Sequence, residues 1–381
     1  MQFKSGVSRV NEANFTIMIR PGVPAFRLAY VSPAVTPYPE ILAMTDIFSV
    51  PDELLNTPLQ IRTSLVTDNV RSMRVMWAQP ENSIPGTVFV GTSPGNYSNI
   101  FPVSNVFTFN ATDLCEQEQM PASSVGFENP GLQIESIITG LEFNTTYYFQ
   151  IVATNLKSLE RNFVTGPAPG GRTKMIVFGD MGSSMFDTDG SSQHSWDFKG
   201  EGEISAPNTS KLVEHLVLAH DATVVNHIGD LSYATGSLSI WDTWLTQIEP
   251  VASHVPYMTG IGNHEMGWSK SAIPGTDSLG ECGVPYISYF PFSSHLYSTL
   301  KPSNKVRHFD GWKAPYYSYT HGNVHVVVMS TEHQYDPSSV QYAWIKQDLA
   351  NVDRSSTHWI MFLGHRRKYI QSSVLFLSCK L

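Results

Sequence analysis

Apolar and polar positions alternate with a period of two through much of the first half of the chain. Met73, Val75 and Trp77 are separated by polar or outward-facing positions, as expected of a half-buried strand. Residues 87–90 and 147–153 indicate further strands, with no stretch of helical periodicity between them. Several strands without a helix predict a β-sandwich for this region.

The flanks of this region are less regular. Residues 1–60 are rich in proline and in short apolar pieces, which favours a β-rich region of short strands and turns. The loop at residues 140–147 resembles the corner of fibronectin type III sandwiches, where a tyrosine hydroxyl, here that of Tyr147, bonds to nearby backbone. We therefore expect a fibronectin III-like domain over residues 61–168.

The run Gly-Pro-Ala-Pro-Gly-Gly at residues 166–171 marks a boundary, because it breaks any regular structure. Beyond it, apolar strands alternate with segments of helical spacing, which predicts a layered α/β domain over residues 172–381. A helix ending at His220 is expected to begin at the capping residues 208–210. Three sets of residues predict buried helix faces: Leu212, Leu216 and Ala219; Trp241, Trp244, Leu245 and Ile248; Tyr342, Ile345, Leu349 and Val352.

Polar turns follow four of the predicted strands in this second half. Asp180 and Asp230 each follow an apolar run and a glycine, Asn263 and His264 follow a third run, and His365 follows a fourth. Ligands of α/β sheets collect beyond the carboxyl ends of the strands. A carboxylate at the end of a buried strand needs a cation or several hydrogen-bond donors to stay charged. The repetition therefore predicts one metal site assembled from several strand ends.

The donor types in these turns narrow the choice of metal. Asp230 offers two oxygens and can bridge a pair of cations. Tyr233, three residues later, gives a phenolate only beside a strong Lewis acid such as Fe(III), since a free phenol titrates near ~10. Asn263 adds an amide oxygen and His365 an imidazole. Oxygen donors with some nitrogen and no thiolate favour iron, manganese or zinc over copper(I) or an iron–sulfur cluster.

Composition adds several exclusions. A net charge of −9, with no basic cluster longer than residues 366–368, argues against non-specific nucleic-acid binding. Three cysteines without a CxxC spacing indicate neither a zinc knuckle nor a disulfide framework, and the pairing of Cys115 with Cys282 is left open. Neither a signal peptide nor a membrane span is visible. Five Asn-x-Ser/Thr sequons nevertheless favour a secreted glycoprotein; they begin at Asn14, Asn96, Asn110, Asn144 and Asn208.

The polar turns together resemble the successive motifs of a known superfamily. Residues 179–182, 229–233, 262–265 and 364–365 are similar to those of the calcineurin-like metallophosphoesterases, and the tyrosine in the second motif is similar to that of the purple acid phosphatases. Shorter phrases resemble the large eukaryotic members, at residues 113–115, 280–286, 317–319 and 330–333. The resemblance implies a mixed α+β and α/β fold, in which a fibronectin-like sandwich precedes a two-sheet β-sandwich flanked by helices.

The resemblance also implies a dinuclear centre of Fe(III) and a divalent ion, which is zinc, manganese or iron. Asp180 and Tyr233 would bind the Fe(III), Asp230 would bridge both ions, and Asn263 and His365 would bind the divalent ion. These assignments come from matching positions in the motifs, not from spacing alone.

By the same resemblance, His264 would lie beside the substrate and act as the catalytic residue, donating to a phosphate oxygen or protonating the leaving group. The implied reaction is in-line hydrolysis of a small phosphate monoester by an acid phosphatase, with a phosphodiesterase or pyrophosphatase as a variant of the same chemistry. We expect no nucleic-acid or membrane partner and a secreted, extracellular or vacuolar location. The sequence does not indicate the substrate or the oligomeric state.

One departure from the family pattern bears on activity. The family ends its site with a Gly-His-x-His turn that gives one imidazole to each ion, and no histidine follows His365 here. We interpret the chain as a C-terminally truncated or alternatively ended copy. His333 is the best substitute ligand, whereas His227 and His325 suit roles in the core or behind the ligands; His194 is a further candidate. The alternative function is a non-catalytic secreted glycoprotein, or a pseudo-phosphatase that serves as a binding module.

Overall fold

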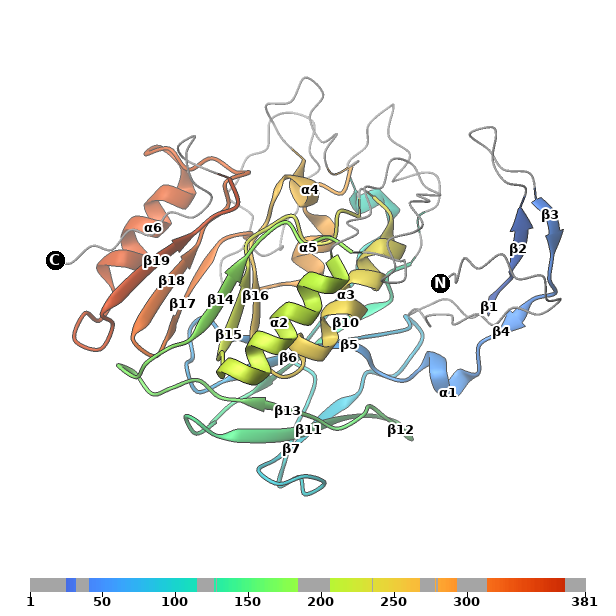
Figure 1. Ribbon diagram of the computed structural model, residues 1–381, viewed down its shortest axis with the longest axis horizontal. Coiled ribbons are helices and arrows are strands. Elements are labelled where there is room, and N and C mark those ends of the chain that lie inside the picture. The colour runs from blue at the N-terminus through green and yellow to red at the C-terminus, as the bar shows by residue number, and fades with distance from the viewer. Residues whose placement is uncertain are drawn as a thin grey trace.

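A computed structural model describes residues 25–31, 41–114, 127, 129–183, 206–234, 236–267, 278, 280–292 and 314–366. Short antiparallel ribbons stand at its N-terminal side, to the right of the main body in Figure 1. The ribbons pair β1 (Ala25–Phe26) with β4 (Phe48–Ser49) and β2 (Ala29–Val31) with β3 (Ile41–Met44), and α1 (Asp52–Leu55) follows.

An antiparallel β-sandwich comes next, as the alternating pattern predicted. One sheet holds β5 (Leu59–Leu65), β6 (Met73–Gln79), β10 (Leu132–Ile138) and β9 (Asn105–Phe107), with η1 (Ala111–Asp113) after it. The other holds β12 (Leu156–Lys157), β11 (Thr146–Ala153), β7 (Thr87–Gly91), β8 (Asn99–Phe101) and β13 (Arg161–Val164). Fully buried Trp77 and Phe149 lie in the core between the sheets. The expected corner is present, because the backbone N–H of Glu142 donates to the Tyr147 hydroxyl at 3.0 Å.

One part of the strand prediction was wrong. The polar positions of β6 are not solvent-facing, since all seven of its residues are buried. The second face of this sheet packs against the other half of the molecule, where α3 lies on β5. Arg74, at a polar position of β6, and Arg62, on the neighbouring β5, are accordingly both buried.

The second half of the chain contains two small sheets with helices around them. The first is parallel and consists of β14 (Met175–Phe178), β15 (Val224–His227) and β16 (Tyr257–Thr259). In the second, β18 (Val324–Val328) is antiparallel to β17 (Tyr317–His321) and parallel to β19 (Trp359–Leu363). The helices are α2 (Ala206–His220), α3 (Leu238–Ala252), α4 (Asn263–Met266), α5 (Val284–Tyr289) and α6 (Val340–Ala350). Figure 1 shows α6 beside the β17–β19 sheet, at the side opposite the N-terminal ribbons.

The predicted helix faces have different outcomes. All four residues predicted for α3 are buried, and they include Trp241 and Trp244. The face predicted for α2 was wrong: Leu212 is 56% exposed, and Val213 and Val217 are buried instead. That helix also begins before the expected capping residues 208–210. On α6, Tyr342 is 42% exposed, so its predicted burial was wrong as well.

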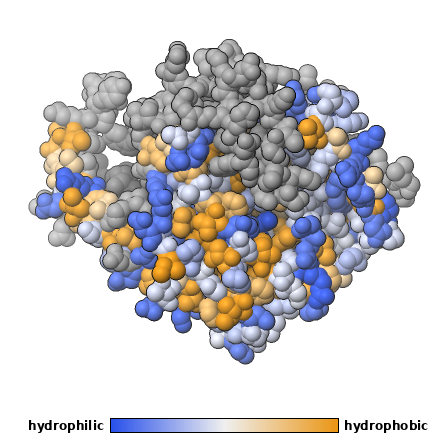
Figure 2. Space-filling view, turned by 180° about the vertical axis from the view of Figure 1, so that it is seen from behind, coloured by the Kyte–Doolittle hydropathy of each residue, from blue (hydrophilic) through white to orange (hydrophobic). Residues whose placement is uncertain are grey.

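The surface combines polar residues with dispersed apolar ones. Figure 2, which views the molecule from behind, shows hydrophobic and hydrophilic residues interspersed over the described part of that face. Exposed apolar side chains gather on the N-terminal ribbon at Ile41, Leu42, Met44, Ile47 and Phe48. Within the described ranges, none of the helices has the combined length and apolar character needed to cross a bilayer.

Candidate metal centre

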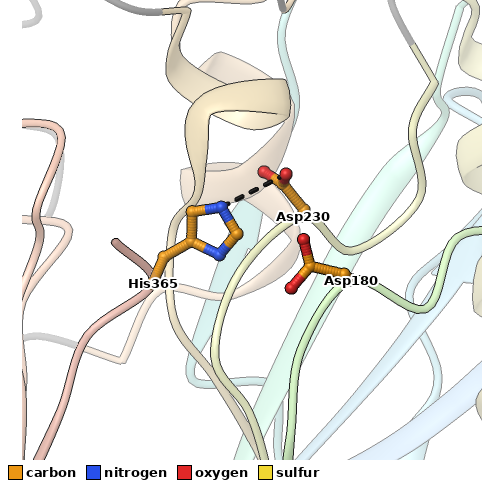
Figure 3. A group of neighbouring side chains, drawn as sticks. All are labelled: Asp180, Asp230 and His365. Atoms are coloured by element: carbon orange, nitrogen blue, oxygen red, sulfur yellow. Dashed lines mark ion pairs between the residues drawn. The ribbon is translucent and has the colours of Figure 1, made fainter. Parts of the chain in front are cut away.

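Three of the predicted turns converge on one place. Asp180 and Asp230 follow the parallel neighbours β14 and β15, whose last paired residues are Phe178 and His227. His365 follows β19 of the other sheet. Figure 3 shows the two carboxylates and the imidazole directed toward one another. One ligand atom from each of these three side chains lies within 4.8 Å of the others, which is close enough for a shared cation.

The backbone of these turns is unusual and explains their glycines. Asp180 and Asp230 have positive φ angles of 57° and 50°, a left-handed region that Asp tolerates better than most residues. Gly229 has a φ of 106°. A Cβ atom at this glycine would lie 2.8 Å from Cγ of His365 and 2.9 Å from the backbone N of Gly262. The glycine therefore allows the histidine turn to approach the aspartate turn.

The remaining predicted ligands lie against this trio. Nε2 of His365 is 3.2 Å from Oδ2 of Asp230 and 3.0 Å from Oδ1 of Asn263. The Tyr233 hydroxyl donates to Oδ1 of Asp180 at 3.2 Å. All five side chains predicted as metal ligands are therefore neighbours in the structure.

His264 lies at the side of the same group. Its backbone N–H donates to Oδ1 of Asp230 at 2.9 Å, and its Nε2 is 3.9 Å from the other oxygen of that carboxylate. The ring stacks obliquely on Tyr233, with 4.3 Å between the ring centroids. Because its backbone and its ring are both fixed, the imidazole is held beside the oxygen-rich centre.

Glu265 is a structural residue of the site that the sequence analysis did not assign. Its carboxylate is fully buried and accepts three backbone hydrogen bonds, from Asp230 at 2.9 Å, Leu231 at 2.7 Å and Gly262 at 2.9 Å. It thereby ties the turn after β15 to the start of α4. The available signal was its place as the fourth residue of the Gly-Asn-His-Glu run, where a glutamate closes a helix N-terminus.

Burial and charge shift the pKa values of this group. Burial would raise the pKa of Asp230, but the hydrogen bond and charge of His365 and the N–H of His264 lower it overall. Burial would lower the pKa of His365, yet Asp230 and further carboxylates raise it to about 9. Burial and the charge of Asp230 raise the pKa of Glu265 to about 8. Closely spaced carboxylates of this kind favour a bound cation.

The donor set fits a hard or borderline metal ion. Two carboxylates, a phenol oxygen, an amide oxygen and an imidazole converge, and the described residues of the site offer no thiolate. Nδ1 of His365 is buried and finds no hydrogen-bond partner within the described chain. This atom, the exposed carboxylate of Asp180 and the neighbouring Asn263 oxygen together suit metal coordination.

The described histidines considered as substitute ligands are not members of the convergent group. His333 is not part of the convergent group; burial lowers its pKa to about 4, and its Nδ1 lies 2.7 Å from the Ser330 hydroxyl. His227 is fully buried, 3.1 Å from the Tyr257 hydroxyl, and His325 pairs with Asp348 at 2.8 Å. His194 lies outside the described residues.

The glycosylation and cysteine predictions meet the structure only in part. The described sequon residues Asn96, Asn110, Asn144 and Asn208 are exposed, and Asn14 lies outside the described residues. Cys282 is disulfide-bonded, whereas Cys115 and Cys379 fall in undescribed parts of the chain, so the pairing of Cys115 with Cys282 stays open.

Comparison with known families places this geometry in context. Residues 58–165 match the N-terminal domain of the purple acid phosphatases, and residues 173–377 match the calcineurin-like phosphoesterases. The chain belongs to the purple acid phosphatases, within the calcineurin-like phosphoesterases. The family predicted from the polar turns is thus confirmed, together with a sandwich domain followed by a metallophosphoesterase domain.

Relatives show both the likeness and its limits. "Probable inactive purple acid phosphatase 9" from Arabidopsis thaliana is 34% identical over 335 residues, which are 84% of this chain and 48% of that protein. A barley "Nucleotide pyrophosphatase/phosphodiesterase" (Hordeum vulgare) is 33% identical over 208 residues, 54% of this chain and 50% of that protein. The chain spans about half the length of the curated relatives it matches.

A solved structure resembles most of the described fold. Purple acid phosphatase PPD1 from yellow lupin (Lupinus luteus) seeds superposes with a TM-score of 0.73 at 29% identity, covering 92% of this chain and 57% of that one. Membership in this family supports a hydrolase-type site in general. The names of several relatives include the word inactive, so the family alone does not establish catalysis by this chain.

Proposed function

We propose that this chain carries the site of a metal-dependent acid phosphatase that hydrolyses small phosphate monoesters. The observation that carries the proposal is the convergence of Asp180, Asp230 and His365 within 4.8 Å, from two different sheets. Stability alone does not call for two carboxylates at this spacing, because like charges repel in a partly buried site. A cation between them removes that repulsion.

Each ligand has a role in this proposal. Asp180 and Tyr233 would hold Fe(III), Asp230 would bind both ions, and Asn263 with His365 would hold a divalent ion, which is zinc, manganese or iron. When bound, the ions supply Lewis acidity and positive charge for phosphate-ester hydrolysis. The left-handed backbone of the aspartate turns presents their carboxylates to the same point.

His264 acts on the substrate in this scheme. Its contact with Tyr233 and its backbone bond to Asp230 fix the imidazole at the rim of the centre. From there it donates a proton to a phosphate oxygen or to the leaving group. We further propose a secreted, extracellular or vacuolar protein, with no nucleic-acid or membrane partner.

A second candidate is a pseudo-phosphatase that keeps the fold and binds without catalysis. The observation that favours it is that, among the described residues, His365 supplies the one imidazole of the convergent group. With a single imidazole among the ligands, metal affinity should be low. In that reading, the sandwich or the residual anion site serves as a binding module.

Metal analysis combined with an aryl-phosphate assay at acid pH separates the two candidates. The protein is reconstituted with iron and zinc, and bound metal, visible absorption and phosphate release are measured together. The enzyme proposal predicts a coloured protein that releases phosphate. A colourless protein that retains no metal and stays inactive would reject the enzyme proposal and support the binding module.

Single substitutions then assign the ligands. Tyr233→Phe should remove a visible phenolate-to-Fe(III) band, and Asp230→Asn should lower retention of both metals. Asp353→Asn is a matched control, since the carboxylate of this exposed aspartate accepts hydrogen bonds from its neighbours Ser355 and Ser356, away from the centre. A band that persists in Tyr233→Phe would refute the role given to this tyrosine.

A further inference from the structure

The turn that carries His365 is held from behind by the segment that follows β18. The backbone N–H of Met329 donates to the carbonyl of Leu363 at 2.9 Å. A Cβ atom at Gly364 would lie 3.1 Å from Cγ of Met329 and 3.1 Å from Cγ2 of Thr331. The two segments are therefore in close contact at the glycine before the imidazole.

Residues on the far side of His365 complete this contact. The backbone N–H of Arg366 donates to the Thr331 hydroxyl at 3.0 Å. Nε of Arg366 donates to both carboxylate oxygens of Glu332, at 2.8 Å and 3.1 Å. The Glu332 side chain has no exposed surface, and that of Arg366 is 28% exposed.

The buried carboxylate of Glu332 depends on its bifurcated hydrogen bond with Arg366. Glu332 needs a positively charged partner because its burial removes water from the carboxylate, and Arg366 is the partner the structure supplies. A charge-assisted bond of this kind is short and directional. Since Arg366 is the residue next to His365, its side chain restrains the backbone that sets the direction of the imidazole.

The imidazole has little other support on its own element. In front it meets Asp230 and Asn263, which are themselves predicted metal ligands. Its Nδ1 has no hydrogen-bond partner within the described chain. The contacts at Gly364 and Arg366, on the other side of the turn, therefore determine the orientation of the His365 imidazole.

We propose that Glu332 and Arg366 are a positioning pair, which orients the His365 imidazole toward Asp230 and Asn263 through the backbone of the turn. The pair touches no ligand directly and acts only through Gly364–Arg366. The expected effect of this pair on metal binding rests on the proposed function, whereas its effect on the orientation of the His365 ring is independent of that function.

The first test measures the ring without metal. Histidine-selective ¹⁵N labelling with NMR follows the His365 ring signals, which the His365→Asn variant identifies by their loss. Glu332→Gln and Arg366→Gln should each shift these signals, and the double variant should shift them no further than either single change, because both act through one contact. Unchanged signals in a folded Glu332→Gln protein would overturn the proposal.

A control pair separates positioning from general stabilisation. Arg161 and Glu249 also form a partly buried ion pair, with 2.6 Å between Nη2 and Oε1, but they join β13 to α3. Arg161→Gln should leave the His365 signals in place even where it lowers the melting temperature. If Arg161→Gln shifted them as much as Glu332→Gln, the effect would be general and the proposal would fail.

The second test titrates Zn²⁺ alone into wild-type protein and the same variants by calorimetry. Glu332→Gln should weaken binding on the order of 10- to 100-fold, as loss of a residue that orients a ligand commonly does. Arg366→Lys and Glu332→Asp, which keep the charges of the pair, should bind Zn²⁺ more tightly than the corresponding glutamine variants. Wild-type protein that binds no Zn²⁺ would count against the proposed function, while equal binding by wild type and Glu332→Gln would count against the positioning pair.

Discussion

Gly229 determines how closely the turn that carries His365 can approach the turn that carries Asp230. Its φ of 106° lies in the left-handed region, and the imidazole of His365 occupies the space where a Cβ would stand. Asp230 follows directly, so any displacement at Gly229 moves the carboxylate as well. The spacing of the candidate ligands therefore depends on the absence of one side chain.

Replacing this glycine should be far more costly than replacing a glycine that is only strained. Gly229→Ala combines a positive φ, with strain of about 1–3 kcal/mol, with an overlap onto His365 and Gly262. Gly95→Ala is the matched control, because Gly95 has a φ of 67° but nothing within 4 Å of the added Cβ. Urea unfolding should show a loss at least about 2 kcal/mol larger for Gly229→Ala. Equal losses would mean that the imidazole moves aside freely.

At this scale the sequence predicts the ligands better than their supports. Asp180, Asp230 and His365 could be found because each ends an apolar run with a polar turn. Asp180 and Asp230 follow neighbouring parallel strands, whose carboxyl ends meet, whereas His365 comes from the other sheet. Glu265 and Glu332 also end strands or begin helices, but nothing in their spacing says which backbone N–H groups or which arginine they face. Such partners come from distant segments and are visible only after folding.

At the scale of elements, the turn between β17 and β18 joins the two halves of the chain. His321 is buried there, and its Nε2 lies 2.9 Å from the Thr223 hydroxyl. A Cβ at Gly166, in the linker after the sandwich, would fall 2.1 Å from the His321 ring. The linker therefore packs directly on the imidazole.

This histidine should make stability depend on pH. Burial lowers the pKa of His321 to about 4 from an ordinary value of 6.5, so below pH 6.5 the unfolded chain takes up the proton first. Its stabilising contribution is complete above pH 6.5 and is lost as the pH falls toward 4, by up to about 3 kcal/mol.

Urea unfolding of wild-type and His321→Gln protein at pH 7.5 and pH 4.5 checks this dependence. The stability difference between the two proteins should shift in favour of the variant at the lower pH, because glutamine takes up no proton. His358→Gln is the control, since His358 is exposed in the folded chain. A difference between wild type and His321→Gln that is the same at both pH values would contradict the prediction.

The corner of the sandwich offers a second test at this scale. Tyr147→Phe removes only the hydroxyl that accepts from the Glu142 N–H, so it should destabilise the protein by about 1 kcal/mol. Tyr148→Phe, on the neighbouring position of β11, is the control for loss of a hydroxyl without this bond. Matching changes in denaturation midpoint for the two variants would contradict the role of the corner.

Helix faces show where periodicity succeeds and where it fails. On α3 the two tryptophans leave no ambiguity, because no other face could bury such large apolar area. On α2 two apolar faces compete, and the one with Val213 and Val217 packs inward while Leu212 and Leu218 are exposed. The choice between faces depends on which neighbour the helix meets, which a local pattern does not contain.

At the scale of the whole molecule, residues of the sandwich region contribute to the core of the metallophosphoesterase half, beside the sandwich's own core. Leu65, Phe109 and Leu114 from the sandwich region belong to the same core as Trp241 and the parallel sheet. Alternation in β6 could not reveal this, because polar residues normally indicate solvent. Here they meet a second protein layer, and hydrogen bonds across the boundary replace those to water.

Arg62 is the clearest of these buried polar residues. Its guanidinium donates to the carbonyl of Tyr289 at 3.0 Å, to the carbonyl of Gln60 at 3.0 Å and to Oε1 of Gln133 at 2.9 Å. It also lies over the ring of Phe290, 5.5 Å from the centroid. Burial lowers its pKa to about 10, which still leaves it charged at neutral pH.

Removing Arg62 should therefore lower the cooperativity with which the sandwich and the metallophosphoesterase half unfold. Arg62→Leu keeps apolar volume but leaves three buried acceptors without their donor, at a cost of about 3 kcal/mol. Calorimetry should show one unfolding transition for wild type, because apolar and polar contacts join the sandwich to the second half, and a lower, split transition for the variant. Arg71→Leu is the control, since Arg71 pairs with Glu142 at the exposed surface and such pairs contribute at most about 1 kcal/mol. A single, unshifted transition in Arg62→Leu would contradict the prediction. It would mean that apolar packing alone makes the two halves unfold together, and that the hydrogen bonds of Arg62 do not contribute.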